Sequence, residues 1–140
     1  MSKVFYDKPI IEQIFEEFYK DMDSQDEDKL INLVNRLPPE DVNKKNKYGN
    51  TVLICATIYN YTEIVKLLSK KEEIDVNIQN MSGDTALIQA SVRSRIEIVK
   101  LLLEKDDIDI NIQDYSRYTA LRYACPEIAN LLKNHQKIDL

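Results

Sequence analysis

Apolar residues along this chain recur at helical spacing in three places that lie 34 positions apart. In each place they occupy positions i, i+3 and i+4, a spacing that puts three side chains on one face of a helix. The three sets are Leu30, Leu33, Val34; Ile64, Leu67, Leu68; and Ile98, Leu101, Leu102. The pattern predicts three helices, over about 29–37, 62–70 and 96–105, with Leu67 and Leu101 on their buried faces.

A second apolar run follows a repeated threonine. Thr51, Thr85 and Thr119 each stand two residues before a leucine, and a threonine hydroxyl at this place can accept a hydrogen bond from the first free amides of a helix. We therefore expect a short helix after Thr51 and another after Thr85. The only two glycines, Gly49 and Gly83, each precede a threonine by two residues, where a turn with positive φ requires glycine.

Apolar and polar residues alternate in residues 75–79 and 109–113, between the helices predicted over 62–70 and 96–105 and the threonine that follows each of them. Such alternation predicts a short extended arm. Together with the glycine turn, the arm forms a projecting finger. A fixed period of 34 residues indicates stacked supersecondary units, which carry their function on a surface rather than in an enclosed active site.

Residues 80–111 are similar to the ankyrin repeat. They include Asn-Met-Ser-Gly-Asp-Thr-Ala-Leu-Ile-Gln-Ala, then Glu-Ile-Val-Lys-Leu-Leu-Leu and Asp-Ile-Asn. The resemblance covers about residues 25–133. The chain departs from the family pattern at its proline (Val52, Ala86, Ala120), its histidine (Ile54, Ile88, Arg122) and its mid-repeat glycine (Asn60, Ser94). The resemblance implies an all-α repeat solenoid of about four ankyrin-type helix-turn-helix units joined by β-hairpin-like fingers. It also implies partner binding by the finger tips and the concave inner-helix face.

The two ends of the chain differ from its middle. Upstream, an aromatic-rich helical stripe from Ile10 to Tyr19 predicts an N-terminal cap. Downstream, the last helix begins four residues early, with Pro126 suited to its first position. We expect a single domain over 1–140. Its parts are a helical cap over about 9–43, full repeats over about 44–77 and 78–111, and a shortened repeat over about 112–140.

Composition narrows the classes of function. The chain has 140 residues, 44% hydrophobic and 31% charged, which suits one soluble domain. Its net charge of −5 argues against nucleic-acid binding, which favours a basic face. No apolar run reaches the ~20 residues of a membrane span, and no signal-peptide pattern is present. We therefore expect no membrane partner and a cytoplasmic location, which would be a host's cytoplasm for a virus or an intracellular pathogen.

Side chains suited to catalysis are few. Cys55 and Cys125 are predicted to lie on different inner helices and not to form a disulfide. Neither cysteine has an identifiable neighbouring base in the pattern, which a nucleophile requires, and the sole histidine, His135, lies in a polar tail. No His or Cys pair has metal-ligand spacing, and no glycine-rich phosphate loop occurs. We expect no enzymatic activity, no cofactor and no metal.

Tyrosine, methionine and arginine, which are enriched in protein interfaces, fall on the predicted fingers and inner helices. With two finger lysines, the candidate partner-binding residues are Lys45, Lys47, Tyr48, Tyr59, Met81, Arg93, Tyr115, Arg117, Tyr118 and Tyr123. For the lysines the alternative is a solvated turn. For Tyr59 and Tyr123 the alternative is packing between units.

These features predict a non-catalytic protein that binds another protein and is monomeric when free. A short chain without an attached effector domain favours an inhibitor or masking partner over a scaffold. The alternative is a structural or assembly protein that self-associates through its repeat stack.

Overall fold

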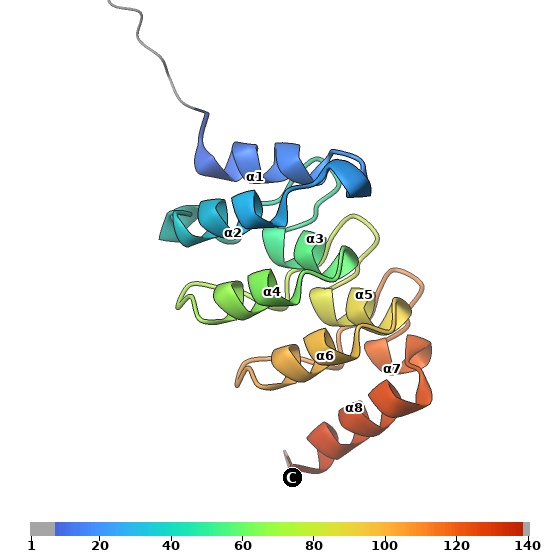
Figure 1. Cartoon of the computed structure of the whole chain (residues 1–140). Coiled ribbons are helices and arrows are strands. Elements are labelled where there is room, and N and C mark those ends of the chain that lie inside the picture. The colour runs from blue at the N-terminus through green and yellow to red at the C-terminus, as the bar shows by residue number, and fades with distance from the viewer. Residues whose placement is uncertain (1–7, 139–140) are drawn as a thin grey trace, which may run out of the picture.

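The computed structural model describes residues 8–138, which form a stack of helices (Figure 1). The helices are α1 (Ile10–Phe18), α2 (Glu27–Asn35), α3 (Val52–Ile58), α4 (Thr62–Ser69), α5 (Ala86–Val92), α6 (Ile96–Leu103), α7 (Ala120–Tyr123) and α8 (Pro126–Ile138), with short 3₁₀ turns η1 (Met22–Ser24) and η2 (Pro39–Asp41). No β-strand occurs within residues 8–138. The helical repeat solenoid predicted from the sequence is confirmed.

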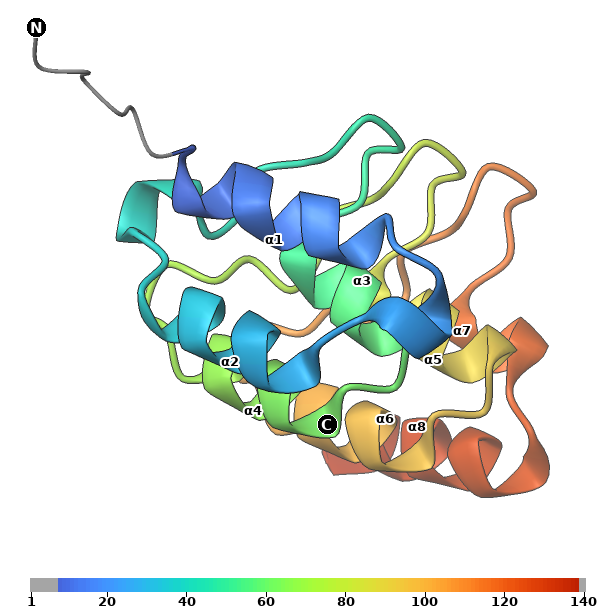
Figure 2. The same ribbon diagram turned by 45° about the horizontal axis from the view of Figure 1, so that its top comes forward.

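The helices lie in two layers. Outer helices α2, α4, α6 and α8 follow one another along one side, and inner helices α3, α5 and α7 along the other (Figures 1 and 2). Helix α1 packs against α2 and α3, so it closes the first end of the stack. The fingers project side by side from the inner layer (Figure 2).

Backbone amides in the first turns of α3 and α5 donate to the threonine hydroxyls that the sequence predicts as caps. The Ile54 amide donates to Thr51 Oγ1 and the Ile88 amide to Thr85 Oγ1, each at 3.2 Å. After each inner helix, Asn60 (φ 63°) and Ser94 (φ 55°) adopt the left-handed conformation that the family pattern assigns to glycine. The turn therefore keeps its shape without glycine, at the steric cost that a side chain brings to this conformation.

The core corrects one expectation about the outer helices. Leu67 and Leu101 are only partly buried, whereas Leu68 and Leu102 are fully buried. In α4 and α6 the inward face follows positions i, i+1 and i+4, with Val65 and Val99 in place of the expected leucines, whereas α2 buries Leu30, Leu33 and Val34 as expected. The reason is that α4 and α6 each pack against their own inner helix and both neighbouring outer helices, and Leu67 and Leu101 lie beside that face.

Asparagines 34 residues apart connect successive units. The Asn43 side chain donates to the Glu73 carbonyl (2.7 Å) and accepts from the Asp75 amide (2.8 Å). Asn77 makes the same pair of bonds one unit later, to the Asp107 carbonyl and the Asp109 amide. A single side chain thus satisfies a carbonyl and an amide of the next loop.

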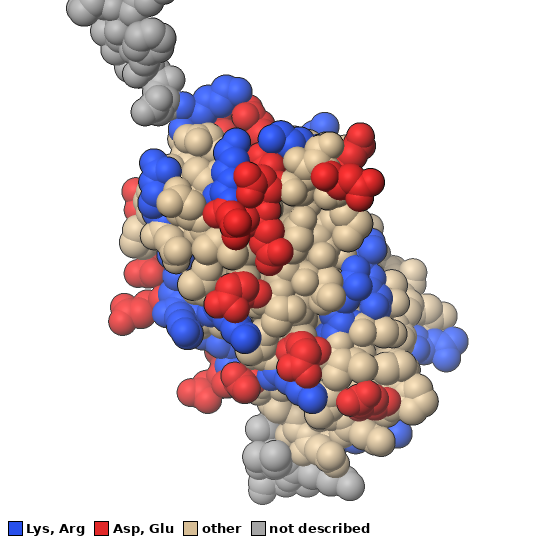
Figure 3. Space-filling view, viewed as in Figure 1, with Lys and Arg blue, Asp and Glu red and all other residues tan. Residues whose placement is uncertain are grey.

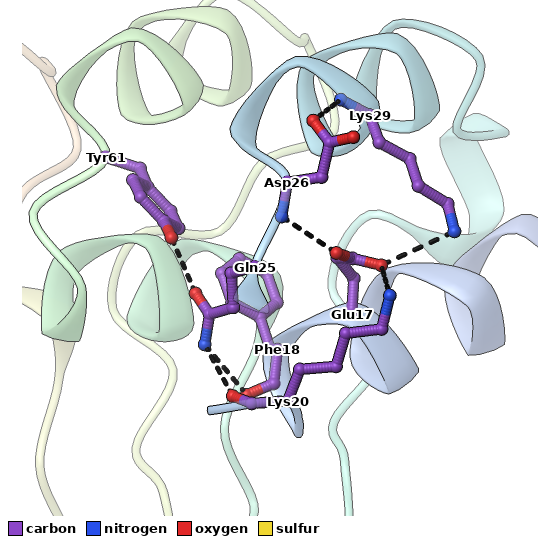
Figure 4. Close-up of polar contacts among 7 residues, drawn as sticks. All are labelled: Glu17, Phe18, Lys20, Gln25, Asp26, Lys29 and Tyr61. Atoms are coloured by element: carbon purple, nitrogen blue, oxygen red, sulfur yellow. Dashed lines mark hydrogen bonds and ion pairs between the residues drawn. The ribbon is translucent and has the colours of Figure 1, made fainter. Parts of the chain in front are cut away.

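A buried carboxylate holds the cap helix to the start of α2 (Figure 4). Glu17 is 1% exposed. Its Oε1 accepts from the Asp26 amide (2.8 Å), and its Oε2 accepts from Lys20 Nζ (2.8 Å) and pairs with Lys29 Nζ (3.4 Å). Burial alone raises the pKa of Glu17, but the hydrogen bonds from Lys20 and Asp26 and the nearby lysine charges hold that pKa below its usual value.

We expect Glu17→Gln to lower the free energy of unfolding by about 1–2 kcal/mol at pH 7, because charged hydrogen bonds to a buried group are lost. A carboxylate with a lowered folded pKa contributes stability above its unfolded pKa and loses it as the pH falls through the folded value. The deficit of the variant should therefore shrink below about pH 4. Urea unfolding at pH 7 and pH 3 measures both effects. Glu16→Gln, an exposed neighbour, is the control, and an equal deficit at both pH values would contradict the role of the charge.

Candidate partner-binding surface

The three fingers, residues 44–50, 78–84 and 112–118, have the same turn at their tips. In the first, Asn46 Oδ1 accepts from the amides of Tyr48 (2.9 Å) and Asn50 (3.0 Å). Asn80 and Asp114 accept the equivalent pairs of amides in the other two fingers. One side-chain oxygen therefore closes each tip and fixes where the following side chains point.

Positive φ recurs at one position of each tip, at Gly49 (74°), Gly83 (79°) and Arg117 (67°). A Cβ on Gly83 would lie 2.8 Å from the Tyr115 amide nitrogen, and one on Gly49 2.8 Å from the Met81 amide nitrogen. The first two tips need glycine because the next finger packs directly on them. No further finger follows the third within the described residues, so Arg117 fits there.

Hydrogen bonds also join neighbouring fingers. The Met81 amide donates to the Tyr48 carbonyl (3.2 Å), and the Tyr115 amide to the Ser82 carbonyl (3.3 Å). Lys45 Nζ donates to the Gln79 carbonyl (2.9 Å). The ammonium of Lys45 is thus engaged within the protein, and the finger backbones are fixed relative to one another.

Large side chains stand exposed along these fixed tips. Lys47, Met81 and Tyr115 occupy the same position in successive fingers, and Met81 and Tyr115 are 69% and 73% exposed. Tyr48 and Tyr118 are exposed beside them. Lys47, Met81 and Tyr115 together form the tip row.

The exposed aromatic surface continues onto the cap helix. Tyr19, at the end of α1, meets the Tyr48 ring edge-on with centroids 6.3 Å apart. Lys47 Nζ lies 4.8 Å from the centroid of Tyr19 and 5.1 Å from that of Tyr48, close enough for cation–π attraction. Sequence reasoning missed Tyr19 as a candidate site residue, because α1 lies outside the 34-residue period.

Tyr59 and Tyr123 are half-buried, and both hydroxyls have internal partners. The Tyr59 ring stacks on Phe18 at 5.8 Å, and its hydroxyl donates to the Phe18 carbonyl (3.3 Å). The Tyr123 hydroxyl donates to Asp114 (2.5 Å), and its ring packs edge-on against Tyr118. This geometry favours packing for Tyr59 and Tyr123. A partner-binding role stays a prediction for all ten candidates, Tyr59 and Tyr123 included.

A comparison with protein-family models matches residues 22–114 to ankyrin repeats, in three copies. The chain belongs to the ankyrin-repeat family. About four repeats are consistent with this match, since α7 and α8 follow residue 114. Ankyrin repeats are generally protein–protein interaction modules and are typically non-catalytic. The comparison with curated proteins found no match.

Two carboxylates of the ankyrin fingers, Asp84 and Asp114, accept hydrogen bonds from side chains of the inner helices that follow them. The hydrogen bond from Tyr123, helped by the amides of Tyr118 and Ser116, holds the pKa of Asp114 below its usual value, and the same bond raises the pKa of Tyr123 to about 12. Burial raises the pKa of Asp84, whose Oδ2 accepts from Gln89 (2.7 Å). Both carboxylates are engaged in holding the repeat together.

The chemistry of the remaining ankyrin surface is sparse. Cys55 is a free, buried thiol, and burial raises its pKa to about 12, which disfavours the reactive thiolate. Cys125 is free and partly exposed, and it lies in the link between α7 and α8 rather than on an inner helix as predicted, because α7 ends at Tyr123. Residues 8–138 hold no group of three His, Cys, Asp or Glu side chains arranged to bind a metal. Over the same residues, no helix combines the length and the apolar character needed to cross a membrane.

Proposed function

We propose that this ankyrin-repeat protein binds a partner protein through its finger tips and concave inner-helix face, without catalysis, and thereby masks or inhibits that partner. The observation that carries the proposal is the tip row. Its large side chains extend into solvent, whereas the backbone beneath them is fixed by bonds to the neighbouring finger. A preorganised surface of this kind loses little conformational entropy when it binds.

The residue types of this surface support a protein partner. Tyrosine and arginine dominate the energetics of known interfaces, and methionine adapts to irregular apolar surfaces. Tyr19, Tyr48 and Tyr118 surround the tip row with further exposed aromatic area. Isolated exposed apolar residues are ordinary, whereas exposed apolar residues gathered on one surface support an interaction site.

Self-association is the second candidate, and one residue favours it. Leu121 is 37% exposed, whereas Leu53 and Leu87, at the same position of earlier units, are each 1% exposed. A second copy stacked on α7 would cover this leucine. Size-exclusion chromatography with light scattering separates the two candidates, since the main proposal requires a monomer in the absence of the partner.

We expect Met81→Ala and Tyr115→Ala each to weaken partner binding by more than about 1 kcal/mol, because each removes a large exposed side chain from the tip row. Neither should move the urea unfolding midpoint, because both side chains are exposed. The partner is first isolated by affinity capture from the native cell, and binding of each variant is then measured by titration calorimetry.

Lys66→Ala and Lys100→Ala are the matched controls for this prediction. Both lysines lie at one repeated position of the outer helices, where they are exposed and pair with Glu63 and Glu97. Neither change should alter binding. If the lysine variants lose the partner while the finger variants keep it, the convex face is the interface and the proposal is wrong.

A further inference from the structure

Charge is unevenly distributed between the fingers with inner helices and the rest of the chain. Residues 44–60, 78–94 and 112–125 contain six cationic residues and two carboxylates, a net charge of +4. They are Lys44, Lys45, Lys47, Arg93, Arg117 and Arg122, with Asp84 and Asp114. Because the whole chain carries −5, everything outside these segments carries −9. The candidate surface is therefore basic on an acidic protein.

Most cations of this surface lack a carboxylate partner. Among the ion pairs within residues 8–138, one involves this surface, Lys44 with Asp41. Lys47 lies over tyrosine rings, and Arg122 lies 5.0 Å from the Tyr118 centroid. Arg93 Nε donates to a neutral amide oxygen of Gln89. By contrast, acidic and basic side chains lie next to one another on the face shown in Figure 3. The unpaired cations leave a positive surface that is complementary to an acidic ligand.

The spacing of the tip row indicates the shape of that ligand. Packed helices of neighbouring repeats lie roughly 8–10 Å apart, and the three residues of the tip row occur once per repeat. A polyproline II segment has three residues per turn and rises about 3.1 Å per residue, so one of its faces presents a side chain every ~9 Å. A β-strand presents side chains on one face every ~7 Å, which does not match the repeat.

We propose that the tip row binds an acidic and apolar segment of the partner in the polyproline II conformation. A carboxylate lies over Lys47, and apolar side chains three and six residues away lie over Met81 and Tyr115. Additional carboxylates near the segment meet Arg117, whose side chain is exposed at the last tip. This inference rests on the proposed function, because it specifies the chemistry of the same surface.

The probes are fluorescein-labelled synthetic peptides measured by fluorescence anisotropy. One has the core Glu-Pro-Pro-Leu-Pro-Pro-Leu, and a second has the reversed order, so that both chain directions are tested. The control has the same composition with glutamate and leucines placed two residues apart. We expect one of the two test peptides to bind at least ten times tighter than the control.

Variants test which residues are contacted. Lys47→Glu should weaken binding of the better peptide at least fivefold. A peptide whose glutamate is replaced by lysine should regain part of the affinity for this variant. Lys66→Glu changes the net charge of the protein equally on the outer face, and should have no effect. A single-stranded oligothymidylate probe should bind more weakly than the better peptide.

Three outcomes would overturn the inference: no binding of either test peptide, equal binding of the control, or tighter binding of the oligothymidylate. These outcomes are separable from failure of the proposed function. If the peptides fail while Met81→Ala still weakens the captured partner, the surface binds a protein of another shape. If both tests fail, the fingers are not the interface.

Discussion

Shortening Leu102 to alanine is expected to lower the free energy of unfolding by about 2–5 kcal/mol, which is the range for a leucine whose removal leaves a cavity in a packed core. Leu102 is fully buried, and its helix α6 packs against α4, α5 and α8. Because neighbouring repeats hold one another in place, they collapse only partly into the space. Urea denaturation measured by circular dichroism gives the change in midpoint.

Leu101→Ala is the matched control, since it removes the same atoms one position away. Leu101 is partly exposed, so its loss should cost clearly less, under about 2 kcal/mol. Leu68→Ala and Leu67→Ala make the same comparison in α4. Equal costs at Leu101 and Leu102 would mean that the inward face of the outer helices is assigned wrongly.

Replacing Gly83 with alanine is expected to cost roughly 2–4 kcal/mol, through left-handed backbone strain and a clash. The new Cβ meets the backbone nitrogen and ring of Tyr115, and a backbone atom cannot move aside without displacing the third finger. The same urea experiment measures the loss.

Arg117→Ala is the control at the equivalent position of the third finger. Arg117 already carries a Cβ at positive φ, so truncating it should change stability by less than about 0.5 kcal/mol. A Gly83→Ala variant as stable as the Arg117→Ala variant would show that the fingers are not held in contact.

The repeat itself was predictable from the chain because its signals are local. Threonine caps, glycine turns and a fixed period each act over a few residues, and Thr51, Thr85, Gly49 and Gly83 have the predicted conformations and bonds. The orientation of the outer helices was not predictable. Positions 65 and 67 are both apolar, so the pattern alone cannot decide which turns inward, and packing against three neighbouring helices makes the choice.

The candidate surface was predictable in part. The period places Lys47, Met81 and Tyr115 at one position of successive fingers, but it carries no information on distances between fingers. Whether Lys45 reaches the Gln79 carbonyl depends on those distances. Tyr19 joins the surface because α1 packs on α3, a contact outside the repeat that no internal periodicity encodes.

The last inner helix gives the stack a weak end. Helix α7 has four residues, and Thr119 makes no capping bond to it, unlike Thr51 and Thr85. In an array where each unit is stabilised by its nearest neighbours, fraying starts at the unit with the weakest intrinsic stability. A ligand that spans all three fingers also contacts this unit, so part of its binding energy goes into suppressing the fraying. For such a ligand, recognition and local folding would be coupled at the third finger.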